Sequence, residues 1–327
     1  MPCSPDFSYF ASPSYLTTSI HIVTIFSIPF SIYGIFCILK ITPKQMSNAK
    51  FPLLNAHFWT IILDIFFNIL SIPMFFFPSA SGIMLGYGAS LIPPTFLLYS
   101  IQALVAVFFS SAIGLFENRQ NVVQTRWKIG RSWVRVLMNV INYLVAVGTV
   151  IPPYLRKVDV EKARMEILKV IPCPIPSFFS PHLFIQTDTP QLVSLLMFLQ
   201  TITLFPQAVF FVSHTLYHLV YVNSSRVSQA TKKLQFKFLI GSLLQFSIPT
   251  FVILQPILYI WFSVNTGYYD QELNNHIILI ISLHGFISSF CMIMVHSAYR
   301  NHFLRLIRLG RTDKLTPVIV SIVPDKV

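Results

Sequence analysis

Long apolar runs constrain the fold of this chain more than any other feature of its sequence. A helix rises about 1.5 Å per residue, so about 20 apolar residues cross the roughly 30 Å hydrocarbon core of a bilayer. Such stretches recur along the whole chain, with short polar links between them. We therefore predict seven membrane-spanning helices, at about residues 20–40, 53–77, 91–116, 134–153, 192–221, 238–262 and 277–296.

Composition excludes a soluble globular domain. Hydrophobic residues make up 54% of the chain and charged residues only 10%, whereas about a quarter of the residues in a soluble domain are charged. The net charge of +12 is also found in proteins that bind nucleic acid, but those proteins gather their basic residues on one surface. Here the basic residues lie in short gaps between apolar runs. We expect an integral membrane protein that binds no nucleic acid.

The basic links predict the orientation of the chain. The segments that follow the first, third, fifth and seventh runs hold 18 of the 23 Lys and Arg residues. The other five lie within 152–191, mixed with acidic residues. Because short cytoplasmic loops are rich in Lys and Arg, we predict an all-α membrane bundle with its N-terminus outside. Residues 1–311 are then one domain, in which 297–311 form an amphipathic helix on the inner surface, and 312–327 are a cytoplasmic tail.

Short motifs spread over nearly the whole chain resemble those of one receptor family. They are Ser12–Leu16, Thr42–Met46, Leu53–His57 with Asp64, Glu117–Arg119, the proline-flanked Cys173 and His296–Arg300. Their order and spacing are similar to those of the nematode serpentine chemoreceptors of class H, within the superfamily of seven-transmembrane G-protein-coupled receptors. The resemblance implies a GPCR-like bundle without a cofactor, in the plasma membrane of chemosensory neurons and their sensory cilia. It implies two partners besides the lipid bilayer: an odorant-like or pheromone-like small molecule and a heterotrimeric G protein.

Two motifs at the inner membrane surface are candidates for the conformational switch and for G-protein coupling. Glu117, Asn118 and Arg119 end the third run, at the place where the resembled receptors carry an acid beside an arginine that meets the G protein. Here Asn118 separates the two charges, which argues against a salt bridge of the same geometry. Tyr299 and Arg300 mark the turn from the seventh run into the amphipathic helix. The alternative is that Arg119 only marks the membrane boundary, as basic residues at an anionic inner leaflet do.

Asp64 is a carboxylate deep inside an apolar run. A charged group at mid-bilayer costs about 2.5–3.5 kcal/mol on insertion scales, so it should face the bundle interior and have partners there. The sequence offers Asn68 one turn on, His284, Ser288 or a bound sodium ion as partners. We interpret Asp64 as a polar hub that takes part in the conformational switch.

Four polar residues fall in the outer halves of the predicted helices 3, 5, 6 and 7: Gln102, Gln200, Gln255 and His284. Such groups can converge on a ligand in an otherwise apolar bundle. Hydrogen bonding between helices is the alternative for each of them.

Cys3 and Cys173 both fall on the predicted outer side, where a disulfide between them is chemically possible, although their spacing does not imply it.

Two other classes of protein compete with the receptor. His214 and His218 are four residues apart on one helix face, and with Asp64 and His284 or His296 they suggest a zinc-dependent membrane hydrolase. Against this, Asp64 lies at mid-membrane and the two histidines near an inner end, so we expect no metal site and no enzyme. A small-solute transporter is the third class, but the runs contain no deep charge pairs of the kind that transport pathways use.

Overall fold

Helices form nearly all of the structure, a computed structural model that describes residues 7–123, 131–156, 158–221 and 229–309. The α-helices are α1 Pro13–Phe36, α2 Ser47–Ile65, α3 Pro94–Val122, α4 Ser132–Gly148, α5 Val160–Val170, α6 Pro190–Val220, α7 Gln229–Thr266, α8 Gln271–Ser282, α9 His284–Val295 and α10 Ser297–Leu309. Short 3₁₀ or π-helical turns lie at Tyr9–Ala11, Cys37–Ile41, Lys44–Met46, Phe66–Ser71, Tyr87–Ser90, Pro152–Leu155 and Pro176–Phe179.

Six helical segments within the described residues are long and apolar enough to cross a membrane: Pro13–Ile41, Ser47–Ser71, Pro94–Val122, Pro190–Val220, Gln235–Thr266 and Gln271–Val295. The last of these joins α8 and α9. The fourth predicted span corresponds to α4, a shorter apolar helix of 17 residues. At about 1.5 Å per residue α4 is about 26 Å long, near the lower limit for a membrane crossing.

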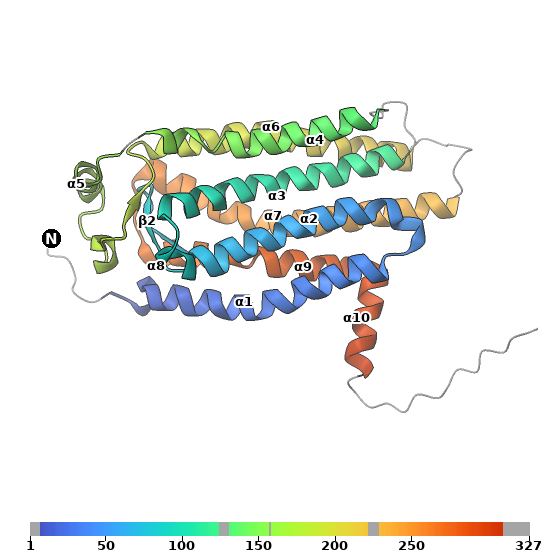
Figure 1. The fold of residues 1–327 in the computed structure, drawn as a ribbon, viewed down its shortest axis with the longest axis horizontal. Coiled ribbons are helices and arrows are strands. Elements are labelled where there is room, and N and C mark those ends of the chain that lie inside the picture. The colour runs from blue at the N-terminus through green and yellow to red at the C-terminus, as the bar shows by residue number, and fades with distance from the viewer. Residues whose placement is uncertain (1–6, 124–130, 157, 222–228, 310–327) are drawn as a thin grey trace, which may run out of the picture.

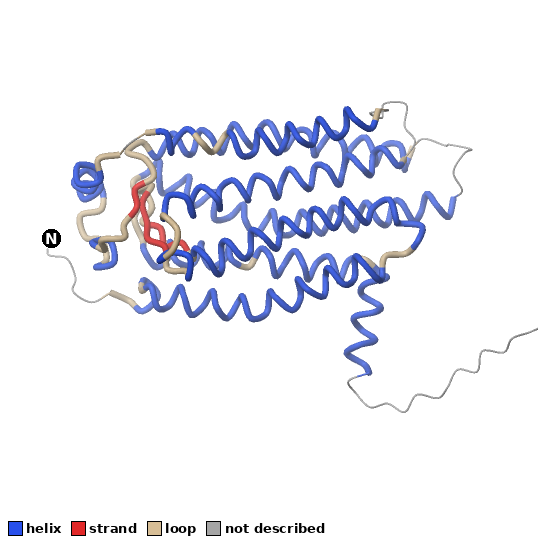
Figure 2. Tube along the Cα trace, viewed as in Figure 1, coloured by secondary structure: helices blue, strands red, loops and turns tan. Residues whose placement is uncertain are grey.

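The long helices lie side by side along the long axis of the molecule (Figure 1). The start of α1, α5 and the strands lie at one end of this bundle, and α10 leaves it at the other (Figures 1 and 2). The helix ends that flank the basic links after α1, α3 and α6 lie at the same end as α10. The helix ends that flank the basic links thus lie away from the acidic and neutral loops, as the sequence predicts.

A small antiparallel sheet covers the end of the bundle at which α1 begins. Its strands are β1 Pro73–Phe75, β2 Ser81–Met84 and β3 Phe184–Ile185, in the order β1-β2-β3, with Met74 opposite Ile83 and Gly82 opposite Phe184. We call the β1–β2 hairpin (residues 73–84), β3 and the Pro176–Phe179 turn the roof. Its side chains Phe76, Phe178 and Ile185 are buried in one core cluster with Leu16, Ile20 and Ile277 of the bundle.

The second span therefore ends earlier than the apolar run predicts. Helical structure stops at Ser71, because Ile72 adopts a left-handed conformation with φ 39° and Pro73 follows it. The apolar residues from 73 to 77 belong to the roof rather than to the helix. Hydropathy alone does not distinguish a buried strand from the end of a helix.

The seventh span is attached to the roof through amide side chains. Three buried amides near the start of α8 donate to backbone carbonyls of neighbouring segments: Gln271 to Phe75 (3.1 Å), Asn274 to Phe77 (3.1 Å) and Asn275 to Phe10 (2.8 Å). These bonds join α8 to the loops that close this end of the bundle.

The amphipathic helix predicted at 297–311 is present as α10. The hydroxyl of Tyr33 in α1 hydrogen bonds to Nδ1 of His302 (2.7 Å), and Phe303 packs against Phe30. Leu306 and Ile307 are 48% and 56% exposed, as expected of a face that meets lipid. Residues 310–311 and the predicted tail at 312–327 lie outside the described residues.

Candidate functional site

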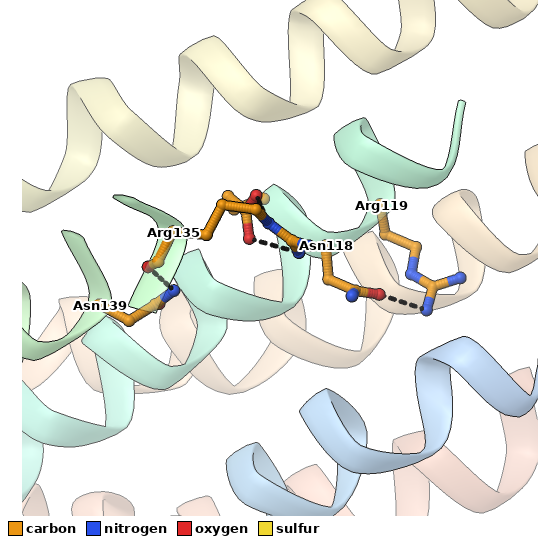
Figure 3. Close-up of polar contacts among 5 residues, drawn as sticks. Asn118, Arg119, Arg135 and Asn139 are labelled. Carbon is orange, nitrogen blue, oxygen red and sulfur yellow. Dashed lines mark hydrogen bonds and ion pairs between the residues drawn. The ribbon is translucent and has the colours of Figure 1, made fainter. Parts of the chain in front are cut away.

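Arg119 lies near the inner end of α3 and is only 8% exposed. Its guanidinium carbon is 4.2 Å from the centre of the Phe238 ring of α7, an arrangement in which the positive charge is attracted to the ring face. Its Nη2 donates to Oδ1 of Asn118 (3.1 Å; Figure 3). Arg119 is therefore held by an aromatic ring of another helix and by its own neighbour in sequence.

Glu117 pairs with Arg135 of α4 rather than with Arg119. Nε and Nη2 of Arg135 donate to the two carboxylate oxygens at 2.6 and 3.0 Å, and the carbonyl of Arg135 accepts a hydrogen bond from Asn139 (Figure 3). Glu117 is 1% exposed, so the bidentate pair is largely shielded from water. Glu117 and Arg119, which Asn118 separates in sequence, thus contact different helices: Glu117 contacts α4, and Arg119 contacts α7.

The Phe238 ring makes a second aromatic contact at the inner end of the bundle. It stacks on His296 with ring centres 4.9 Å apart, and the Nε2 of His296 lies 3.3 Å from Oε1 of Gln245 in α7. His296 in turn makes an edge contact with Tyr299. Arg119, Phe238 and His296, which we call the inner stack, therefore connect α3, α7 and the end of α9.

Tyr299 and Arg300 secure the turn into α10. The Tyr299 hydroxyl lies 2.7 Å from Thr42 Oγ1, and burial raises the pKa of Tyr299 to about 12, so the phenol keeps its proton. Arg300, which is exposed, donates to the carbonyl of Met294 (2.9 Å). Tyr299 thus ties α10 to the link between α1 and α2, whereas Arg300 closes the end of its own span.

Asp64 faces the bundle interior and accepts two hydrogen bonds. One comes from Ser27 of α1, and the other from Nδ2 of Asn68, one turn on (2.7 Å). Asn68 also donates to the carbonyl of Ser282 in α8 (3.0 Å). His284 is 1% exposed; its Nδ1 donates to the Ile281 carbonyl (2.9 Å), and its Nε2 has no partner among the described residues. The cluster joins α1, α2 and the seventh span.

The four outer polar residues occupy different surroundings. Gln102 accepts hydrogen bonds from Tyr154 (2.9 Å) and from Gln186 beside β3 (3.0 Å). Gln200 donates to the Ala146 carbonyl and to Thr149, both in or beside α4. Gln255 is exposed on α7, and no hydrogen bond to it is found within the described part of the chain. His284 lies in the Asp64 cluster. These four side chains therefore do not converge on one point.

The phenol of Tyr154 completes the network around Gln102. Nε2 of Gln186 also lies 3.2 Å from the Tyr154 hydroxyl, so two amides and a phenol form a closed set of hydrogen bonds under the roof. Burial, with Tyr99 nearby, raises the pKa of Tyr154, so its hydroxyl remains a donor. This network fixes β3 to α3.

A family comparison accounts for the fold and the motifs together. The family model described as "Serpentine type 7TM GPCR chemoreceptor Srh" matches residues 11–309, which is most of the chain. The chain belongs to the Srh family of serpentine chemoreceptors. Among curated proteins, Serpentine receptor class H-72 of Caenorhabditis elegans is 27% identical over 325 residues, covering 97% of this chain and 92% of that protein.

The fold of this Srh chain is that of rhodopsin. The crystal structure of squid rhodopsin superposes with a TM-score of 0.53 and 14% identity, covering 95% of this chain and 92% of the other. This similarity confirms the prediction of a GPCR-like, all-helical membrane bundle. Family membership also confirms the recognition from motifs, and it identifies a multi-pass membrane receptor rather than an enzyme.

The two histidines that suggested an enzyme take part in helix packing in this Srh chain. His214 Nδ1 lies 3.1 Å from Nε2 of Gln120 in α3, and the His214 and His218 rings are 4.6 Å apart. Among the described residues, no group of three His, Cys, Asp or Glu side chains is placed to hold a metal ion.

The cysteines divide into two kinds. Cys37 and Cys291 are free and buried in the bundle. Cys173 is disulfide-bonded, whereas Cys3, the partner that the sequence suggests for it, lies outside the described residues.

Sequence reasoning missed several residues of these clusters. Ser27 and Arg135 looked like an ordinary small residue and one of several link arginines, and Phe238 is one of 31 phenylalanines. Their roles depend on how the helices are rotated against one another, which one sequence does not show. For Arg135 alone a signal existed, because it lies at the start of the fourth apolar run, where a charge at the membrane boundary can take a partner from a neighbouring helix.

Proposed function

We propose that this chain detects an external small molecule and activates a heterotrimeric G protein. The observation that carries the proposal is the environment of Arg119. This arginine is buried at the inner end of α3, and it pairs with no carboxylate among the described residues. Arg119 contacts α7 through the face of the Phe238 ring. Such a contact is worth about 0.5–2 kcal/mol, which a ligand's differential affinity for two conformations readily exceeds.

The switch works through the inner stack. In this conformation the Phe238 ring covers the guanidinium of Arg119, and His296 stacks on that ring. An agonist that favours separation of α7 from α3 removes that cover and exposes Arg119 to the G protein. The Asp64 cluster and the Tyr299–Thr42 bond connect the same movement to α1, α2 and α10.

The ligand acts on the outer half of the bundle. Of the four outer polar residues, Gln102 is the best supported, because it lies under the roof and connects α3 to β3 through Gln186. Gln200 and His284 contribute to helix contacts, and Gln255 provides an exposed amide on α7. We expect Gln102→Leu to shift the agonist concentration for half-maximal response, whereas an unchanged concentration dependence removes Gln102 from the ligand site.

The experiment that tests the function is a screen of volatile and soluble odorants in reporter cells, with a panel of Gα subunits and a readout of G-protein activation. With an agonist in hand, Arg119→Ala is expected to abolish the response while surface expression is retained. Arg131→Ala is the matched control, because Arg131 is an exposed arginine at the same end of the bundle. A full response from Arg119→Ala contradicts the proposed role of Arg119.

The cellular site belongs to the same proposal. A chemosensory receptor works at the plasma membrane of the cell that senses the cue, and we place this chain in the sensory cilia of chemosensory neurons. A fluorescent fusion that accumulates in the cilia supports this placement. One that stays in internal membranes of those neurons contradicts it.

A further inference from the structure

The seventh span is divided into two helices without a proline. α8 ends at Ser282 and α9 begins at His284, with Leu283 between them. Sharp kinks in helices arise at proline, at Gly/Ser pairs, at π-bulges, or where a side chain or water inserts into the backbone hydrogen bonds. Residues 271–295 contain no proline, and two side chains of the second span contact the backbone at this break, so we assign the break to inserted side chains.

Two side chains of the second span provide the interruption. Nδ2 of Asn68 donates to the carbonyl of Ser282 (3.0 Å), which in a continuous helix would accept from the backbone N–H four residues on. The carboxyl group of Asp64 lies against the backbone of Gly285. A Cβ atom at Gly285 would be 2.5 Å from both Cγ and Oδ1 of Asp64. Only a glycine allows the carboxyl group to come so close.

The two halves of this span are attached to different parts of the molecule. α8 donates through Gln271 and Asn274 to the backbone of the roof hairpin. α9 contacts α1 through a 3.2 Å bond between Ser289 and Ser31, and His296 at its end joins the inner stack. The break therefore falls between a half held at the outer end and a half held at the inner end.

We propose that Asp64, Asn68 and Gly285 form a hinge that lets α9 and α10 move as one unit while α8 stays with the roof. Gly285 and Asn68 are positioning residues: they set the angle between α8 and α9 and touch neither ligand nor G protein. Signalling enters this proposal only through the proposed function above. The hinge itself is a property of the receptor alone, so it is tested without ligand or G protein.

The test measures two distances in the full chain in lipid nanodiscs, by electron–electron resonance between spin labels. With Cys37 and Cys291 replaced by serine, one pair of labels at the exposed residues Ser132 and Asn301 reports the inner end. A second pair, at the exposed residues Leu91 and Leu273, reports α8 against the outer end. Gly285→Ala is expected to shift the inner distance and to leave the outer one unchanged.

Removal of the Asp64 carboxyl group identifies the contact. In an Asp64→Ala background the added methyl group meets no carboxyl atoms, so Gly285→Ala is expected to have no further effect on the inner distance. Gly148→Ala is the matched control, because a Cβ there meets nothing within 4 Å. The hinge is overturned by an equal shift of both distances, by the same shift with and without Asp64, or by an inner distance like that of the Gly148→Ala control.

The amount of each variant that accumulates in the membrane is a second test of the contact between Asp64 and Gly285. If Gly285→Ala alone does not accumulate in the membrane, the Asp64→Ala, Gly285→Ala double variant is expected to accumulate at the level of Asp64→Ala. A double variant that remains as poorly expressed as Gly285→Ala contradicts the proposal.

Discussion

Glu117 and Arg119 show how two residues that nearly touch in sequence are separated by a helix. Residues two apart do not face each other on a helix surface, so a carboxylate and a guanidinium in this register cannot pair without distortion. Glu117 instead pairs with Arg135 of α4, and Arg119 meets Phe238 of α7. One turn of α3 thus contacts two neighbouring helices by different physical means.

The Glu117–Arg135 pair is expected to stabilise the contact between α3 and α4. In Arg135→Ala the Glu117 carboxylate loses its partner while it stays buried, which costs about 3 kcal/mol for a shielded pair. Thermal unfolding of the purified receptor should occur at a clearly lower temperature than for Arg131→Ala, the exposed control. Equal unfolding temperatures for the two variants would mean that the pair adds nothing to stability.

The inner stack predicts a gain of function. Phe238→Ala removes the ring that covers Arg119, so ligand-free G-protein activation should rise. Phe238→Trp should keep it low, because tryptophan attracts a cation at least as well. Phe236→Ala, at a 37% exposed position two residues away, is the control. If ligand-free activation by Phe238→Ala equals that by Phe236→Ala, the Phe238 ring does not restrain Arg119.

The burial of Asp64 among polar partners could be predicted from sequence alone, because a carboxylate inside an apolar run needs hydrogen-bond partners within the bundle. Its partner Asn68 followed from helical spacing. Ser27, by contrast, comes from another helix, and Gly285 matters only because a carboxyl group occupies the place of its side chain. Contacts between helices depend on rotation and depth, which hydropathy does not specify.

At the scale of elements, the roof is the part of the fold that sequence reasoning did not predict. Residues 78–90 are uncharged and rich in Gly and Ser, a composition typical of loops, yet they contain β2 and its connections. Strands of two to four residues carry little pattern of their own. They form here because Phe76, Phe178 and Ile185 are buried against the bundle and because neighbouring strands satisfy their backbone groups.

Asn275 is expected to hold the segment before α1 against α8. Asn275 donates to the carbonyls of Phe10 and Ser12 at 2.8 and 3.4 Å. Asn275→Leu removes both bonds at similar size, so hydrogen exchange over residues 9–15 should become faster while exchange in the α3 core stays slow. Exchange by mass spectrometry measures this directly. Unchanged protection of residues 9–15 would show that other contacts hold the segment.

At the scale of the whole molecule, the fold depends on the number of membrane crossings. Hydropathy predicted seven runs, and the family and the rhodopsin fold agree with that number. α4 has 17 residues and is the shortest of the crossings, whereas six other segments of the described chain are long and apolar enough to cross a membrane. The charge pattern favours a crossing by α4, because 18 of the 23 basic residues lie on one side only if α4 crosses the membrane.

The topology also determines what the clusters can do. With seven crossings, the roof and the Gln102 network face the outside, and the inner stack faces the cytoplasm. With six, the two ends of the chain share one side, and the basic links after α3 and α6 lie on opposite sides of the membrane. The receptor mechanism requires the first arrangement.

The most direct measurement attaches one epitope tag to each end of the chain and detects both in intact and in permeabilised cells. The account predicts that the N-terminal tag is labelled in intact cells and the C-terminal tag only after permeabilisation. Labelling of both tags on the same side of the membrane would contradict it.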